Sequence, residues 1–502
     1  MDFKGFIVTT IIISLFLMST ITIPTNKCDT LEDKTLSEKV DIPTWFINEK
    51  WVYDLNLIFD SENLSFQGEI KNLTLKVEKI KRIQFNNKTI PVYKNRLTGK
   101  IEGKLTPSEP VSWPFPIKGN ITGYSYVKIS DLSQIKTDLT IKGTTQIGGG
   151  ASVWFIDETK GEKVAFKINL KNEFNPSLEN YDFPIQINDS WITYFKTNIS
   201  ASLSIAGGQY QEKISTDFSR KQNLTCTSQN QIKTHLGQFN SYQISSLDTD
   251  DNIICYVPDI KNLAKLKLNY TDQNKSLFLT SEIKSFTNIS QQINVEETLN
   301  PKTQYVNKKI EISGKINNKD SNQSIKNKQI TIEIPNIQKN YTTYTNQKGR
   351  YSVSIPAPNI KDYTPTSSSN FGSDGIITWF ISNDKKYYKV KTFTSKNDTI
   401  SPSVTIEKPL KNNLYMKNKK ICGFFTTLVI GDIDIKISAI DYETAIEKVE
   451  IYIDGNLEKV MKKSPYIYEW KQKNTGEHSI KTVVTDKGGN QKQDTLKIKK
   501  IF

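Results

Sequence analysis

The chain has 502 residues, of which 36% are hydrophobic, 24% charged and 10% aromatic, and its formal net charge is +14. This length exceeds what one hydrophobic core supports, so several domains are expected. A single continuously apolar stretch excludes a polytopic membrane protein. Four cysteines and two histidines exclude a disulfide mini-scaffold and disfavour a His-rich metal site. The positive excess is Lys spread along every segment, which favours solvated faces over a nucleic-acid surface.

The apolar stretch lies at the N-terminus, over residues 7–23, and Pro24 ends it. Its length lies between a secretory core and a membrane span, so residues 1–28 are expected to be a signal peptide or an N-terminal membrane anchor. Residues 29–44 then form a linker. Export to the cell surface or beyond follows, and any membrane contact would be made through this segment alone.

Asn-x-Ser/Thr sequons recur along the chain as far as Asn397, which agrees with export. An Asn-rich chain also produces such triplets by chance, so the signal is supportive only. The glycosylation candidates are Asn63, Asn72, Asn120, Asn198, Asn223, Asn269 and Asn340.

From residue 45 onward the dominant hydrophobic period is two. Residues 51–59, 73–80 and 200–205 alternate, and Gly and Asn clusters separate such runs. Long windows with helical periodicity are scarce. The sequence therefore predicts an all-β protein and argues against the three-layer α/β folds that house most dinucleotide enzymes.

An internal echo occurs in the first half of the chain. Residues 45–53 resemble residues 183–194, because in each an apolar run meets an Asn-acidic turn before a Trp opens a strand. Two β subdomains, 45–168 and 169–295, are expected from it. Together with Cys255-Tyr-Val-Pro258, this pattern resembles the curved antiparallel half-barrels of envelope lipoproteins. Two plain β-sandwiches remain the alternative.

Aromatic residues in this half are the ligand-binding candidates: Trp113, Phe115, Trp154 and Phe155. An open curved sheet must cover its concave apolar face with a helix, a partner or a ligand. No long covering helix is evident in the sequence. A lipid-like or polysaccharide ligand, or an envelope component, is therefore expected there, unless a closed sandwich buries these aromatics.

Cys226 and Cys255 are placed in adjoining strands, and an exported chain meets oxidising conditions. A disulfide between them would close a loop of about 30 residues and stabilise the fold by roughly 3 to 4 kcal/mol on the chain-entropy model. Two buried free thiols are the alternative. Cys28 and Cys422 are expected to be unpaired.

After a polar linker over residues 291–308, three segments (310–316, 328–334 and 345–355) resemble the carboxypeptidase-regulatory-like β-sandwich. Gly349 stands where a hairpin turn requires positive φ. The resemblance covers 303–398 and implies an accessory sandwich without peptidase activity.

Residues 400–502 resemble the bacterial and archaeal Ig-like domains of extracellular proteins. The motifs are Val449-Glu-Ile-Tyr-Ile-Asp-Gly455, Pro465-Tyr-Ile-Tyr-Glu-Trp470 and Asp486-Lys-Gly-Gly-Asn490, in Ig order. Val449, Tyr466 and Trp470 are expected in its core. The predicted fold class is thus all-β. The N-terminal half forms one or more curved antiparallel sheets or a half-barrel, and two Ig-like sandwiches follow it.

No hydrolase, zincin, nucleotide or C-x-x-C motif occurs, and His235 and His478 fall in different domains. Asp441, Asp454, Asp486 and Asn490 suit Ca²⁺ chemically, but turn roles are favoured for them. No catalytic, metal or cofactor residue is therefore assigned. The expectation is a non-enzymatic surface protein without a nucleic-acid partner; an extracellular hydrolase with accessory sandwiches is the alternative, because carboxylate pairs have no fixed spacing.

Overall fold

The computed structural model describes residues 39–61, 64–107, 114–147, 162–205, 210–246, 253–272, 275–289, 292–358, 371–396 and 398–501. Their regular elements are strands and short 3-10 turns, so the all-β prediction is confirmed. None of these residues forms a helix long and apolar enough to cross a membrane. The expected signal or anchor segment, 1–28, lies outside the described residues.

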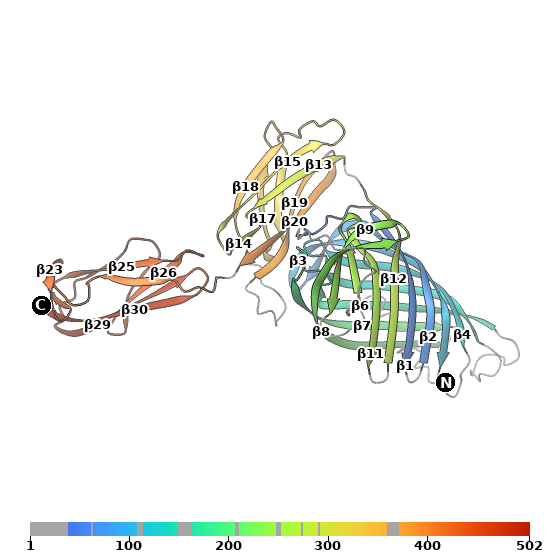
Figure 1. Cartoon of the computed structure of the whole chain (residues 1–502), viewed down its shortest axis with the longest axis horizontal. Helices are drawn as coiled ribbons and strands as arrows, with labels where there is room; N and C mark the ends of the chain where they lie inside the picture. Colours follow the sequence, from blue (N-terminus) through green and yellow to red (C-terminus); the bar gives the residue numbers. More distant parts are fainter. Residues whose placement is uncertain are drawn as a thin grey trace.

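The first unit is one antiparallel sheet that closes on itself, because β1 pairs with both β2 and β12. Figure 1 shows its long strands in blue to green. The strands are β1 (Lys50–Ser61), β2 (Leu64–Phe85), β3 (Lys88–Pro107), β4 (Phe115–Lys128), β5 (Gln134–Ile147), β6 (Glu162–Leu178), β7 (Ser190–Ile205), β8 (Tyr210–Thr234), β9 (Gly237–Ser246), β10 (Ile253–Val257), β11 (Asn262–Asp272) and β12 (Lys275–Thr287). A 3-10 turn, η2 (Pro258–Ile260), joins β10 to β11. We call this unit the closed sheet.

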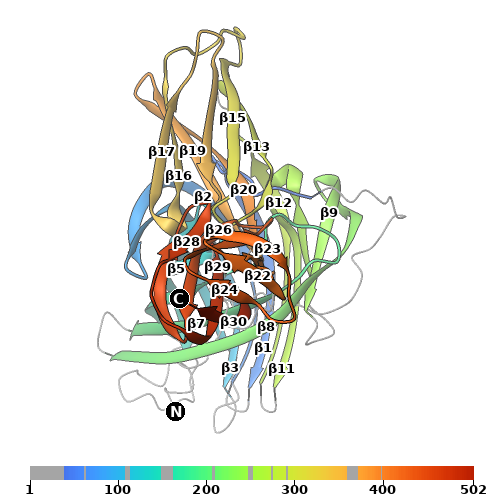
Figure 2. The same ribbon diagram turned by 90° about the vertical axis from the view of Figure 1, so that its left-hand side faces the viewer.

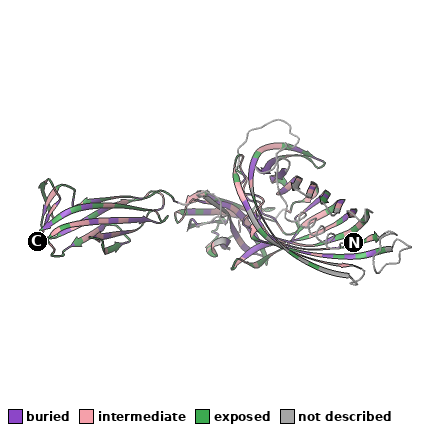
Figure 3. Ribbon diagram, turned by 90° about the horizontal axis from the view of Figure 1, so that it is seen from below, coloured by how far each residue is buried: buried purple, intermediate pink, exposed green. Residues whose placement is uncertain are grey.

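Alternation along the strands produces its core. On β1, Tyr53, Leu55 and Leu57 are buried while the residues between them are more exposed, and Figure 3 shows the same alternation of colours along the curved wall. Glycines relieve crowding where strands bend: a Cβ on Gly103 would lie 2.7 Å from the Phe66 ring. A Cβ on Gly143 would lie 2.1 Å from the Lys118 carbonyl oxygen. Such close approaches require glycine in a strongly curved sheet.

The two segments of the internal echo share the same backbone turn. Asn48 and Asn188 both have positive φ, 75° and 69°. The Asn48 N–H donates to the Val77 carbonyl at 2.8 Å, and the Asn188 N–H donates to the Cys226 carbonyl at the same distance. The two turns, however, start strands of one sheet. The expected boundary between 168 and 169 falls inside β6, so the halves are not separate subdomains or separate sandwiches.

The second unit is a two-sheet sandwich that begins earlier than expected. One sheet is β13-β15-β18 and the other β14-β20-β19-β16-β17. β13 and β14 occupy most of the segment 291–308, which was expected to be a linker. The strands are β13 (Ile293–Asn300), β14 (Thr303–Tyr305), β15 (Lys309–Asn318), β16 (Gln329–Ile334), β17 (Lys339–Tyr344), β18 (Arg350–Pro356), β19 (Phe371–Ser382) and β20 (Lys385–Lys396), with the 3-10 turn η3 (Pro335–Ile337).

Gly349 has the expected positive φ, 69°, but not in a hairpin. It lies between β17 and β18, and these strands belong to different sheets: β17 pairs with β16, and β18 with β15. The hairpin prediction was wrong because local sequence fixes the turn's φ, whereas the long-range pairing of each strand decides which sheet it joins.

The sandwich packs on the closed sheet through the chain that precedes β1. Ile42 and Thr44, expected in a linker, are buried. The Ile42 N–H donates to Thr392 Oγ1 at 3.1 Å, and Thr44 Oγ1 accepts from the Val390 N–H at 3.1 Å. These bonds tie the segment 39–46 to β20. The sandwich is consequently fixed to the end of the closed sheet where β1 begins.

The C-terminal unit is a second sandwich, seen end-on in Figure 2. Its sheets are β21-β25-β28 and β23-β22-β24-β30-β29-β26-β27. The expected core residues Val449, Tyr466 and Trp470 are buried. The strands are β21 (Ser403–Lys408), β22 (Asn413–Met416), β23 (Lys419–Gly423), β24 (Leu428–Ile430), β25 (Ile433–Ile440), β26 (Ile446–Ile453), β27 (Asn456–Met461), β28 (Tyr466–Trp470), β29 (Gly476–Asp486) and β30 (Gln491–Ile501).

Candidate ligand cavity in the closed sheet

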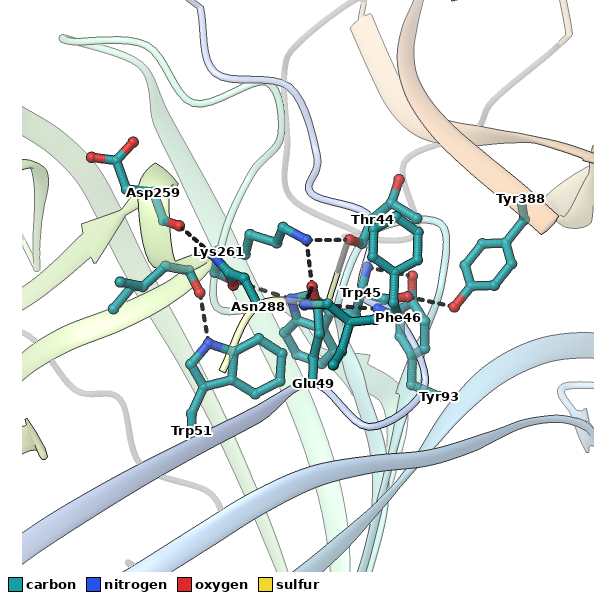
Figure 4. Close-up of polar contacts among 12 residues, drawn as sticks. Thr44, Trp45, Phe46, Glu49, Trp51, Tyr93, Asp259, Lys261, Asn288 and Tyr388 are labelled. Atoms are coloured by element: carbon teal, nitrogen blue, oxygen red, sulfur yellow. Dashed lines mark hydrogen bonds and ion pairs between the residues drawn. The ribbon is translucent and has the colours of Figure 1, made fainter. Parts of the chain in front are cut away.

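A buried ion pair closes the end of the closed sheet where the chain enters it. Glu49 is fully buried, and Lys261 Nζ lies 2.6 Å from its Oε1. The same Nζ donates to the Thr44 carbonyl at 3.2 Å, and the Phe46 N–H donates to Glu49 Oε2 at 2.8 Å. Figure 4 shows these contacts converging on Glu49. A buried carboxylate needs such partners, because an unpaired buried charge is strongly destabilising.

Two tryptophans from the first echo segment hold η2 against this end. Trp51 Nε1–H donates to the Ile260 carbonyl at 2.6 Å, and Trp45 Nε1–H donates to the Lys261 carbonyl at 3.0 Å. The Tyr388 hydroxyl, from the sandwich, donates to the Trp45 carbonyl. The two tryptophans thus fasten this end of the closed sheet, and the Tyr388 bond joins it to the sandwich (Figure 4).

The closed sheet has a cavity of about 230 Å³, and Trp45 lines part of it. Its lining is mainly apolar, with neutral polar side chains from several strands, and it contains no Asp, Glu, Lys, Arg or His. It exceeds the roughly 150 Å³ at which an apolar cavity already binds benzene. The lining residues are Trp45, Tyr53, Leu55, Leu73, Leu75, Leu97, Ser125, Val127, Leu132, Gln134, Thr137, Leu178, Asn180, Tyr181, Asn262, Leu263, Leu266, Leu279 and Ser281.

The tyrosines of this wall stay neutral. Burial raises the pKa of Tyr53 well above its ordinary value, and burial also raises the pKa of Tyr181. The Tyr53 hydroxyl donates to the Leu263 carbonyl at 3.1 Å. Behind Tyr181, the ring of Tyr256 packs 5.1 Å away, centroid to centroid. The wall therefore offers aromatic surface and no charge at physiological pH.

A small polar patch interrupts the apolar lining. Asn95 Nδ2–H donates to the Ser125 hydroxyl at 3.4 Å, and Gln134 Nε2–H donates to the Thr137 hydroxyl. Asn95 Oδ1 is buried without a partner among the described residues. An apolar cavity with a few neutral polar groups suits a lipid-like molecule with an uncharged polar group. It supplies none of the carboxylate pairs that glycoside hydrolysis uses.

The four aromatic candidates from the sequence are not among these lining residues. Trp113, Trp154 and Phe155 lie outside the described residues. Phe115 opens β4, and its backbone pairs with Leu105, but its side chain is not described. Sequence reasoning missed Tyr53, Tyr181 and the leucines. The period-two pattern of residues 51–59 held the available signal, because it places Tyr53 and Leu55 on one face.

The expected disulfide between Cys226 and Cys255 is wrong. Cys226 is a free, buried cysteine, and burial raises the pKa of its thiol to about 12. Cys226 pairs with Ile244 of β9, while Cys255 pairs with Gln243 on the other side of β9. Two strand spacings of about 4.8 Å therefore separate them, and a disulfide requires Cα atoms within about 7 Å. Cys255 is disulfide-bonded, but not to Cys226. Cys422 is free and exposed, as expected, and Cys28 lies outside the described residues.

The acidic residues of the C-terminal sandwich serve its turns. Asp441 Oδ2 accepts from the Thr444 and Ala445 N–H groups, and Asp486 Oδ1 accepts from the Asn490 N–H at 2.8 Å. Their carboxylates lie near that of Asp398, with ligand atoms within 4.8 Å of one another. Asp454 is elsewhere, 2.6 Å from His478 Nδ1. These hydrogen bonds are those of turn residues, and the carboxylates of Asp398, Asp441 and Asp486 also lie at the spacing of cation ligands.

The glycosylation candidates are strand residues where they are described. Asn72, Asn120 and Asn340 are exposed, and Asn223 and Asn269 are partly buried. Asn63 lies outside the described residues, and nothing is described of the Asn198 side chain. The exposed three can accept a glycan without unfolding a strand.

Residues 402–482, from β21 into β29, match the bacterial Ig domain family. A comparison with curated proteins gave no match. Solved structures with likeness include fibronectin(III)-like modules of Clostridium thermocellum CbhA, with 19% identity over 41% of this chain and 95% of that chain, and a TM-score of 0.18. A 1.5-MDa bacterial ice-binding adhesin is 12% identical over 67% and 91%, with a TM-score of 0.18. A tetra-tandem repeat from the extending region of a large adhesion protein is 11% identical over 91% and 92%, also at 0.18. These scores support no functional transfer, so the Ig match defines the class of the C-terminal sandwich alone.

Proposed function

We propose that the chain is an exported, non-enzymatic surface protein whose closed sheet binds an apolar, lipid-like molecule. The single observation that carries this proposal is the cavity, with its mainly apolar and wholly uncharged described lining. Burial of apolar surface stabilises a bound ligand by about 25 cal/mol per Å².

The two sandwiches act as spacers or adhesion modules behind this unit. The Ig match over 402–482 and the regulatory-like pattern of 303–398 support that role. Each sandwich has its own hydrophobic core, so it can fold as a module that projects from the closed sheet. An exported chain with an N-terminal anchor or signal segment places the whole assembly on the cell surface.

The competing hypothesis is an extracellular hydrolase, which needs two carboxylates about 5 to 10 Å apart in a cleft. No acidic side chain belongs to the described lining of the cavity. Hydrolysis of a polysaccharide or peptide by the purified full chain would establish this hypothesis and overturn the non-enzymatic assignment.

The binding proposal is tested with N-phenyl-1-naphthylamine, a neutral probe whose fluorescence rises in apolar surroundings. The full chain is expected to bind it saturably. Leu97 lines the cavity, so Leu97→Phe should fill part of it and weaken binding at least fivefold. Leu236→Phe, at an exposed turn position, is the matched control and should leave binding unchanged. Equal affinities of the two variants would contradict the proposed site.

A further inference from the structure

A second pocket lies on the first sandwich, at the end remote from the closed sheet. The near end of β16 meets the closed sheet, since Arg82 bonds Glu333 and Gln338 Nε2–H donates to the Thr89 carbonyl. The other end carries an open pocket of about 680 Å³. Figure 1 shows this end of the sandwich uppermost. The lining residues are Lys315, Gln323, Ser324, Lys326, Gln347, Lys348 and Arg350.

The charged residues that line this pocket are all cationic. Four of its seven lining residues are cationic and none is acidic, and no described carboxylate forms an ion pair with any of the four. Glu296, opposite Lys315 on β13, instead accepts a hydrogen bond from Asn294 at 3.1 Å. Glu296 thus lies beside Lys315 without an ion pair, and the side chains of Lys326, Lys348 and Arg350 are exposed to solvent.

Strand register places two of these cations side by side. Lys315 of β15 stands directly opposite Arg350 of β18. Like charges directly opposite each other in an antiparallel pair destabilise the sheet. A bound anion would remove this repulsion by satisfying both groups at once.

The backbone holds the pocket in shape. The Ile325 N–H donates to the Ile316 carbonyl at 3.0 Å, and the Ile316 N–H donates to the Gly349 carbonyl at 2.9 Å. These bonds fix the segment before β16 and the turn before β18 against β15. Gly349 is required at the crossing, because its φ is 69° and a Cβ would lie 2.5 Å from the Ile316 carbonyl oxygen. The backbone positions of the cations are therefore fixed before a ligand binds, while the side chains of Lys326, Lys348 and Arg350 are exposed.

The lining indicates the chemistry of the ligand. Four cations spread through an open pocket match a ligand with several anionic groups better than one small ion. Gln323, Ser324 and Gln347 add side chains that hydrogen-bond hydroxyl groups. The lining offers no aromatic ring for a base to stack on and no apolar side chain to enter a bilayer. We propose that this pocket binds a segment of acidic polysaccharide.

This site is independent of the cavity in the closed sheet, so either proposal can fail alone. The test uses the full chain and polygalacturonate in titration calorimetry, with dextran as the neutral polymer. Saturable binding of polygalacturonate is expected, with affinity falling as salt rises from about 0.05 to about 0.3 M. Dextran should not bind. Monomeric galacturonate at equal carboxylate concentration should bind at least tenfold more weakly, because it neutralises one cation at a time.

Paired variants locate the site. Lys315→Gln with Arg350→Gln removes two pocket charges and should weaken binding at least tenfold. Lys419→Gln with Lys420→Gln removes two charges from exposed positions on β23 and should change affinity less than twofold. The pocket variant should not melt at a lower temperature than the parent, because it also removes the opposed pair. Failure to bind polygalacturonate, equal losses in the two variants, or equally tight binding of galacturonate would each overturn the proposal.

Discussion

Replacing Lys261 by Met tests whether the buried ion pair fastens the entrance of the closed sheet. The substitution keeps the aliphatic stem but removes the Nζ bonds to Glu49 and to the Thr44 carbonyl. Removing one partner of a buried pair costs about 3 to 5 kcal/mol. Here the Lys261 side chain is 22% exposed, and Glu49 keeps the Phe46 N–H, so we expect about 2 to 3 kcal/mol.

The assay is hydrogen exchange of the full chain, followed in peptides that cover residues 44–52 and 258–263. A loss of 2 to 3 kcal/mol corresponds to a roughly 30- to 150-fold faster exchange of amides that open with this end. Lys265→Met is the matched control, because Lys265 forms an exposed pair with Glu282 at 3.8 Å. Such surface pairs contribute about 0 to 1 kcal/mol.

A second variant separates charge from packing. Adding Glu49→Gln to Lys261→Met neutralises the stranded carboxylate and should recover at least half of the lost protection. Exchange in Lys261→Met no faster than in Lys265→Met would refute the reasoning. So would a double variant less protected than Lys261→Met alone.

Three further predictions concern single residues. In the native chain Ellman's reagent should react with the exposed Cys422 and, only after unfolding, with Cys226. The Cys226 thiol is buried, and burial raises its pKa to about 12. Rapid labelling of Cys226 at pH 8.5 would contradict this prediction. Gly349→Ala should lower the free energy of unfolding of the first sandwich. The loss should exceed by about 1 to 3 kcal/mol the loss that Gly489→Ala causes in the second sandwich, because Gly489 also has positive φ but meets nothing within 4 Å. Equal shifts of the urea midpoint from the parent chain would count against the close approach at Gly349. Burial raises the pKa of Glu297, so its favourable contribution is present below the ordinary value of 4.5 and is lost as pH rises through the folded pKa. Glu297→Gln should therefore flatten the decline in unfolding midpoint between pH 4.5 and 7, and an unchanged decline would be the contrary result.

The sequence predicts those features that depend on nearby residues. Period-two alternation places β1 and its inward Tyr53 and Leu55, and an Asn before an acidic residue gives both echo turns their positive φ. The C-terminal sandwich follows from its motifs, because these place Val449, Tyr466 and Trp470 in its core, and all three are buried. The strand and the turns are decided by neighbouring residues, and the C-terminal sandwich by motifs spread over residues 449–490.

The closure of the first sheet depends on pairings that no local pattern specifies. β1 meets β12 across more than two hundred residues, and closure turns the concave face into the wall of a cavity. The same limit explains the Cys226 and Cys255 error. Both residues were placed in adjoining strands, yet β9 runs between them, and only the register shows it. The pairing of Lys315 with Arg350 is likewise visible only across strands.

The central claim, that the closed sheet holds an apolar molecule, is tested most directly by native mass spectrometry of the full chain purified from its own host. We expect an added mass that is lost on organic extraction and returns as an uncharged or weakly polar lipid-like compound. Leu97→Phe should reduce the occupied fraction, whereas Leu236→Phe should not. A chain that carries no such mass and also fails to bind N-phenyl-1-naphthylamine would contradict the account.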